Sequence, residues 1–102
     1  GNMVYEGYET YRLGLEVLGP YVAMVHVKNA RWREVGTRPD GSAAWRAEWA
    51  PLTQGVVDMA ALARALRQVG YDGWLSFEDF STKQPLRDRM RDNLAYARRV
   101  MD

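Results

Sequence analysis

Helix-type and strand-type hydrophobic patterns alternate along the chain. From Tyr8 to Leu18 the apolar residues recur at steps of three and four, which predicts a helix that ends at Gly19-Pro20. The next run, residues 21–28, is apolar and rich in β-branched side chains. Such a run is typical of a strand buried on both faces, as in a parallel sheet that helices cover.

A second helix and a second strand follow in the same order. Asp58 has the position of an N-cap for a helix through Val69, and Gly70 predicts its end. Residues 73–80 read as a strand, and residues 86–101 as a last helix. When a helix connects two strands of one sheet, the two strands pair in parallel and the connection is a right-handed crossover. The predicted fold class is therefore α/β.

Between the first strand and the Asp58 helix, residues 29–57 show no sustained period. The sequence predicts a long irregular loop on the carboxyl-end side of the strands, and loops of this length are often functional. Its tryptophans could cover the apolar face of a sugar or pack the loop on the body, and its arginines could bind a phosphate or remain solvated. These residues are Trp32, Trp45, Trp49, Arg31, Arg33 and Arg46.

Size and charge exclude several classes of protein. A chain of 102 residues predicts a single domain, residues 1–102. Fourteen Lys and Arg against 13 Asp and Glu give a net charge of +1, too balanced for nonspecific binding to nucleic acid or anionic membranes. The chain has no cysteine, no signal-peptide pattern and no apolar stretch of the ~20 residues that span a bilayer. We therefore expect a cytoplasmic protein with no nucleic-acid or membrane partner.

The predicted sheet is too small to stand alone. Two parallel strands form at best a marginal core, because parallel sheets are normally covered on both faces. Each outer edge would also present unpaired backbone groups that recruit another chain. We expect an incomplete domain, completed by other residues or by other copies of the chain in a homo-oligomer.

Three polar side chains are predicted to meet at one edge of this sheet. His26 and Lys28 share a face of the first strand, and Glu78 stands near the end of the second. The carboxyl ends of parallel strands coincide, and α/β folds and barrels place their sites there. His26 and Glu78 could be two ligands of a divalent metal, with Lys28 facing substrate. Alternatively, His26 is a hydrogen-bonded core residue and Glu78 is a solvated carboxylate.

Short phrases in a characteristic order cover nearly the whole chain. They are Gly1-Asn2-Met3, Glu6-Gly7-Tyr8-Glu9, Leu18-Gly19-Pro20-Tyr21, His26-Val27-Lys28-Asn29, Trp49-Ala50-Pro51-Leu52, Gly55-Val56-Val57-Asp58, Gly70-Tyr71-Asp72-Gly73-Trp74 and Leu75-Ser76-Phe77-Glu78-Asp79. Together they resemble the C-terminal third of the sugar phosphate isomerase/epimerase family, the xylose isomerase-like barrels. The resemblance implies a partial (β/α)8 TIM barrel whose last two parallel strands and three flanking helices lie in this chain. A complete barrel has about 250 residues.

The resemblance also implies a metal site. In that family two Glu, one Asp and one His hold a divalent ion, and His26 and Glu78 match the His and the last Glu. The other two ligands would precede this chain. We expect Mn, Mg, Zn or Co in the complete protein and no tightly bound metal in this chain, because two protein ligands are too few.

The chemistry that the resemblance implies is proton transfer next to a carbonyl through an enediolate. Glu78 would act as metal ligand and catalytic acid/base, and Lys28 and Asn29 would contact a sugar or sugar phosphate. Arg31 and Trp32 in the following loop are further candidates for binding substrate. The related endonuclease branch carries more histidines in this region, and the single His of this chain excludes it.

Two functional hypotheses result. The first is a fragment of a metal-dependent sugar or sugar-phosphate isomerase/epimerase that is inactive as an isolated chain. The alternative is a non-enzymatic, truncated α/β module that self-associates through its open strand edges.

Overall fold

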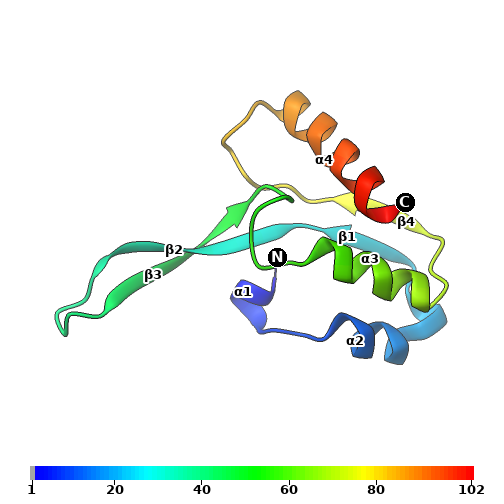
Figure 1. Ribbon diagram of the computed structural model, residues 1–102, viewed down its shortest axis with the longest axis horizontal. Helices are drawn as coiled ribbons and strands as arrows, with labels where there is room; N and C mark the ends of the chain where they lie inside the picture. The colour runs from blue at the N-terminus through cyan, green and yellow to red at the C-terminus, as the bar shows by residue number, and fades with distance from the viewer. Residues whose placement is uncertain (1) are drawn as a thin grey trace.

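The computed structural model describes residues 2–102 and has a mixed α/β architecture with a parallel strand pair (Figure 1). Its elements follow the chain in this order: α1 (Met3–Glu6), α2 (Tyr11–Leu18), the 3-10 helix η1 (Gly19–Tyr21), β1 (Met24–Val27), β2 (Asn29–Thr37), β3 (Ala43–Ala50), α3 (Met59–Gln68), β4 (Trp74–Phe77) and α4 (Leu86–Met101).

The predicted parallel pair is confirmed. β1 and β4 pair in parallel with His26 opposite Ser76 and Val27 opposite Phe77, and α3 lies on the connection between them. One further hydrogen bond extends the pairing, since the Glu78 N–H donates to the Val27 carbonyl at 2.9 Å. The carboxyl ends of the two strands therefore lie side by side, as a parallel pair joined by one helix requires.

Helix α3 begins and ends where the sequence predicts. The Asp58 side chain accepts a hydrogen bond from the Ala61 N–H at 2.8 Å, which is the expected N-cap. Gly70 has a φ of 69°, and this left-handed conformation ends the helix. Ala63 and Leu66 on its inner face are buried.

The core lies on one face of the strand pair. Val27 is only 4% exposed and packs with Leu52, Val57 and Met59 in a cluster that strand and helix side chains surround. These surrounding residues are Tyr11, Val25, Val56, Leu62, Leu75, Phe77, Tyr96 and Val100. The other face is open, with Met24 51% exposed. The prediction of a strand buried on both faces is therefore wrong for this chain, because its helices cover a single face.

The predicted irregular loop contains a β-hairpin, residues 29–50, which we call the arm. β2 and β3 pair antiparallel, and the turn closes through a hydrogen bond of 2.7 Å from the Arg38 N–H to the Ser42 carbonyl. Pro39-Asp40-Gly41 is a turn signal, and Gly41 adopts a φ of 85° there. The loop prediction is wrong, because residues 30–33 and 45–49 alternate apolar and charged side chains as strands do, and the two short runs pair across the turn. Figure 1 shows the arm projecting away from the helices.

The outer helices differ from prediction in their extent and packing. The first predicted helix begins at Tyr11, after the separate turn α1, and α2 has no buried residue. Helix α4 has the predicted extent, but its predicted apolar face is largely exposed at Leu86, Met90 and Leu94. The face that meets the core is the neighbouring one, with Tyr96 and Val100. No helix among residues 2–102 is both long and apolar enough to cross a membrane.

Candidate functional site

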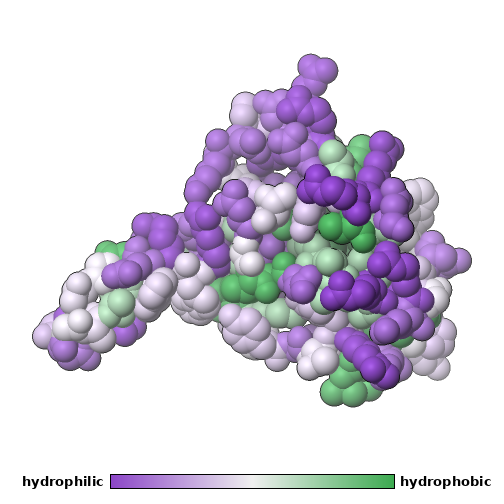
Figure 2. All heavy atoms as spheres, in the orientation of Figure 1, coloured by the Kyte–Doolittle hydropathy of each residue, from purple (hydrophilic) through white to green (hydrophobic). Residues whose placement is uncertain are grey.

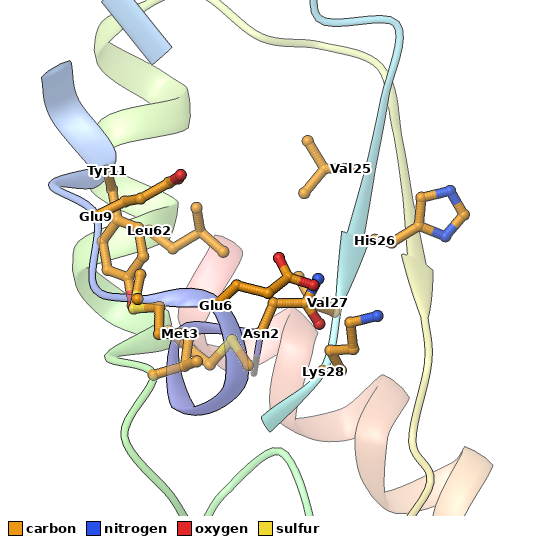
Figure 3. A pocket seen from close by; sticks show the side chains of 13 residues that line it. Asn2, Met3, Glu6, Glu9, Tyr11, Val25, His26, Val27, Lys28 and Leu62 are labelled. Carbon is orange, nitrogen blue, oxygen red and sulfur yellow. The ribbon is translucent and has the colours of Figure 1, made fainter. Parts of the chain in front are cut away.

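His26, Lys28 and Glu78 meet at the carboxyl ends of β1 and β4. Glu78 Oε2 lies 2.7 Å from Lys28 Nζ, and Glu78 Oε1 lies 3.7 Å from His26 Nδ1. Figure 3 shows His26 and Lys28 on one side of β1 and Val25 on the other. The predicted convergence is confirmed, and it follows from the two-residue alternation of strand side chains.

The electrostatics favour an ionised Glu78. The hydrogen bond from Lys28 lowers the pKa of the Glu78 carboxyl, partial desolvation opposes this, and the positive charge of Lys28 lowers it further. The side chains of His26 and Glu78 are 49% and 32% exposed on the open face. His26 is therefore not a buried core residue in this structure, and Glu78 is a carboxylate that a ligand can reach.

An aromatic wall stands beside this trio. Tyr5 and Trp49 have ring centroids 4.8 Å apart, and Trp49 and Phe80 have centroids 5.1 Å apart. Lys28 Nζ lies 5.6 Å from the centroids of both the Trp49 and the Phe80 rings. Phe80 follows Glu78 by two residues on the same face, which the sequence shows, whereas no sequence signal indicates Tyr5. The wall gives the site an apolar surface next to its charges.

A cavity of about 290 Å³ runs along the unpaired side of β1 (Figure 3). Its polar lining includes Asn2, Glu6, His26 and Lys28, and the Glu6 side chain points towards β1. Its apolar lining includes Val25, Val27, Tyr11, Met59 and Leu62. In the described part of the chain β1 has β4 as its single strand neighbour, so this cavity lies where a further strand would pair.

The predicted substrate contact Asn29 is buried, and its side chain forms hydrogen bonds with backbone groups of the protein. It is 2% exposed, and its Oδ1 accepts hydrogen bonds from the Ala30 and Val57 N–H groups at 3.0 and 3.1 Å. Its Nδ2 donates to the Leu52 carbonyl at 3.0 Å. Gly55 passes so close that a Cβ there would collide with Asn29 Oδ1 and the Ala30 carbonyl. Asn29 thus ties the base of the arm to residues 52–57.

Arg31 and Trp32 lie on the arm and do not join the trio. Arg31 Nε donates to Glu48 Oε1 at 2.7 Å, and its Nη1 donates to Gln54 Oε1 at 3.1 Å. Hydrogen bonds from Arg33 and then Arg31 lower the pKa of Glu48, against partial desolvation. Trp32 is 46% exposed, farther along the arm. Their predicted substrate contacts remain untested predictions.

Asp79, the carboxylate next to Glu78 in the sequence, bonds to residues of α4 and of the segment before it. The Asp79 side chain accepts hydrogen bonds from Ser81 N–H at 2.9 Å and Asn93 Nδ2 at 2.8 Å, and Arg89 lies near it. Burial by itself would raise the pKa of Asp79, but these hydrogen bonds and the Arg89 charge lower it overall. Asp79 therefore fastens the β4–α4 connection to α4 and leaves Glu78 as the site carboxylate.

The donor geometry fits part of a metal site. Bonds from a divalent ion to imidazole nitrogen and carboxylate oxygen are about 2.0–2.2 Å, so one ion can touch two atoms separated by the 3.7 Å between His26 Nδ1 and Glu78 Oε1. Residues 2–102 hold no group of three or more His, Cys, Asp or Glu placed to bind an ion. His26 and Glu78 are the two side chains at the carboxyl ends of β1 and β4 with this separation.

A comparison with protein families adds the decisive observation. The model of the xylose isomerase-like TIM barrel matches residues 1–100. The chain belongs to this family. No curated protein and no solved structure gave a significant match.

Membership in the xylose isomerase-like TIM barrel family agrees with the geometry. The parallel β1–β4 pair with its connecting helix is a strand-helix-strand unit of such a barrel. His26, Lys28 and Glu78 lie at the carboxyl ends of these strands, the end at which barrels of this kind carry their active sites. The family match indicates a sugar isomerase/epimerase-type or related enzyme.

Proposed function

We propose that this chain is the part of a metal-dependent sugar or sugar-phosphate isomerase/epimerase that contributes His26, Lys28 and Glu78 to the active site. The observation that carries the proposal is the position of Glu78. Its carboxylate lies between an imidazole and an ammonium group at the carboxyl end of a strand in a xylose isomerase-like barrel.

The chemistry requires a base that is ionised at neutral pH. Glu78 meets this condition because a Glu carboxyl is ordinarily ionised at neutral pH, and the hydrogen bond from Lys28 lowers its pKa further. The carboxylate takes the proton from the carbon next to the substrate carbonyl, the C–H electron pair forms the carbon–carbon double bond of an enediolate, and the carbonyl oxygen gains the negative charge. Return of a proton to the same carbon on its other face gives epimerisation. Return to the former carbonyl carbon gives isomerisation, with the hydroxyl proton of the neighbouring carbon passing to the former carbonyl oxygen.

Lys28 and His26 have different tasks in this scheme. The Lys28 ammonium, 2.7 Å from Glu78 Oε2, holds the carboxylate in place and offers positive charge to a substrate oxygen. His26 and Glu78 Oε1 are the proposed metal ligands. A bound divalent ion would supply electrophilic polarisation of the carbonyl. Mn, Mg, Zn and Co are the candidate metals.

The fold supports the view that further residues complete this site. The described residues form two parallel strands, whereas a barrel of this family closes with eight. The open face of β1 and β4 and the unpaired side of β1 would then be covered by the other strands. We propose that the remaining metal ligands come from residues outside this chain or from other chains, and that the isolated chain is inactive.

Solvent-deuterium exchange into sugars tests the function. Protein from its natural reading frame, with Mn²⁺ added, should transfer deuterium to the carbon next to the carbonyl of at least one sugar or sugar phosphate. Glu78→Gln should abolish the exchange, and calorimetry should show micromolar metal binding that Glu78→Gln and His26→Ala both weaken. Glu16→Gln is the matched control, because Glu16 forms an equally short ion pair of 2.7 Å with Arg12 on α2. Unchanged metal binding in both site variants would show that the ligand assignment is wrong.

A second candidate is a non-enzymatic module that self-associates. The exposed apolar stripe of Leu86, Met90 and Leu94 on α4 and the open strand edges favour it. Light scattering of the 102-residue chain should then show stable oligomers of folded chain. Absence of deuterium exchange in the natural protein, together with such oligomers, would favour this candidate over the enzyme.

A further inference from the structure

The two faces of the arm differ in chemistry. Residues directly opposite each other in an antiparallel pair share a face. The pairs Ala30–Trp49, Trp32–Ala47 and Glu34–Trp45 therefore place three tryptophans on one face, alternating between the strands. The pairs Arg31–Glu48 and Arg33–Arg46 place the arginines of this part of the arm on the other face. We call the first surface, Trp32, Trp45 and Trp49, the tryptophan face.

The tryptophan face is continuous with the candidate site. Trp49 at its base contacts Phe80 and Tyr5, and its ring lies 5.6 Å from the Lys28 ammonium that binds Glu78. The alternation of side chains along β1 and β2 puts His26, Lys28 and Trp32 in the same phase. The tryptophan face therefore extends from the Glu78 site along the arm, on the side of the chain that carries His26 and Lys28.

The outer part of this face is uncovered. Trp32 and Trp45 are 46% and 52% exposed, and the arm stands clear of the body in the view of Figure 2. A two-stranded hairpin by itself is marginally stable in water, so large exposed indoles on it are costly unless a partner covers them. The indole ring is also a flat apolar surface of the kind on which the apolar face of a sugar ring stacks.

From this arrangement we infer that the tryptophan face binds a second, uncharged sugar ring, so that the substrate is a disaccharide-like sugar with a free reducing end. The inference rests on the proposed function, because the reducing ring has to occupy the site at Glu78. The second ring would stack on Trp32 and Trp45.

Charge placement favours an uncharged second ring over a phosphate. The tryptophan face carries the acidic residue Glu34 beyond Trp32, whereas Arg33 and Arg46 lie on the opposite face. A phosphate would favour the arginine face, because guanidinium groups bind phosphate through paired hydrogen bonds. The negative charge of Glu34 also disfavours an extended polyanion on the tryptophan face.

Binding and turnover of a sugar panel test the inference. The natural protein is titrated with reducing monosaccharides, their 6-phosphates and disaccharides such as cellobiose and maltose, and tryptophan fluorescence and deuterium exchange are followed. At least one disaccharide should bind about tenfold more tightly than its reducing monosaccharide. In the Trp32→Ala/Trp45→Ala double variant this preference should disappear through a higher KM for the disaccharide. Trp32→Phe/Trp45→Phe should retain most of the preference, because phenyl rings still stack.

The matched control changes the other face of the same arm. Arg46→Ala should leave the disaccharide preference unchanged, and circular dichroism checks that each variant keeps its fold. Equal affinity for monosaccharides and disaccharides throughout the panel would overturn the inference, as would a preference lost in Arg46→Ala but kept in the double variant. A double variant that keeps the preference and dissociates a dimer would show that a second copy covers the tryptophan face.

The same panel separates the two proposals. Deuterium exchange with no disaccharide preference contradicts only the inference about the tryptophan face. A disaccharide preference in fluorescence with no exchange into any sugar contradicts the proposed enzyme and leaves a sugar-binding surface.

Discussion

Replacing Asn29 by alanine distinguishes a structural residue from a substrate contact. Asn29 is 2% exposed, and three short hydrogen bonds join its side chain to the Ala30 N–H, the Val57 N–H and the Leu52 carbonyl, at 3.0, 3.1 and 3.0 Å. A fourth contact, to the Val57 carbonyl, is longer at 3.5 Å. Asn29→Ala leaves these backbone groups without their partner at the base of the arm.

The cost follows from the three short bonds. Each contributes about 1 kcal/mol net, and a buried group left without a partner costs about 1–3 kcal/mol. We therefore expect Asn29→Ala to lower the free energy of unfolding by about 3 kcal/mol. Small domains are stable by only about 5–15 kcal/mol, so the loss should be plain in the midpoint of urea denaturation.

Asn29→Asp gives a sharper second measurement. The introduced carboxyl group keeps an acceptor for the Ala30 and Val57 N–H groups, but when ionised it faces the Leu52 carbonyl oxygen without a proton to donate. Folding should therefore raise the pKa of this carboxyl above its unfolded value of about 3.9. A raised folded pKa means that its protonated form stabilises the fold, so stability should fall as pH rises from about 4 to 7.

Urea denaturation and sugar turnover are measured on the same variants. If Asn29→Ala unfolds within about 1 kcal/mol of the wild type while deuterium exchange disappears, the structural reasoning is wrong and Asn29 contacts substrate. If stability falls as expected and the folded fraction retains exchange, Asn29 has no direct part in the chemistry.

Three further predictions concern other elements, and the first includes a control substitution. Gly55→Ala should lower the free energy of unfolding, measured by urea denaturation, by about 2 kcal/mol or more, because φ is 137° and the added Cβ would collide with backbone and side-chain oxygens. Gly41→Ala is the control, with a φ of 85° and open space around the added Cβ, and it should lower the free energy of unfolding by about 1 kcal/mol. Equal losses in the two variants would show that the collision at Gly55 does not occur. Lys28→Met should raise the pKa of Glu78 towards its ordinary value in a carboxyl NMR titration. A carboxyl whose pKa is lower in the folded protein stabilises the fold at pH values above its unfolded pKa, and this stabilisation is lost as the pH falls through the folded pKa. Lys28→Met should therefore lose less stability than the wild type on acidification. A Glu78 pKa that does not change in this variant would refute the pairing of Lys28 with Glu78. Asp58→Ala should cost about 1 kcal/mol and reduce helical circular dichroism, whereas an unchanged stability would show that the N-cap contributes nothing.

The elements that the sequence predicts well are those with local signals. Helix α3 has its N-cap at Asp58, its apolar spacing and its final Gly70 within one segment, so neighbouring residues suffice to define it. The parallel pairing of β1 and β4 follows from the chain order, since a helix between two strands brings them together in parallel. The meeting of His26, Lys28 and Glu78 follows from that pairing and the alternation along each strand.

Tertiary structure decided what depends on distant partners. The arm escaped prediction because its alternation of apolar and charged residues is confined to the short runs 30–33 and 45–49, and the pairing of β2 with β3 depends on register across the turn. The structural environment of Asn29 depends on backbone groups at Leu52 and Val57, which lie 23 and 28 residues away. Tyr5 reaches the aromatic wall only because α1 folds against the base of the arm. The spacing of residues along the chain determines which face of a helix or strand each side chain occupies. Which residues a side chain contacts on that face depends on packing between segments that are far apart in the sequence.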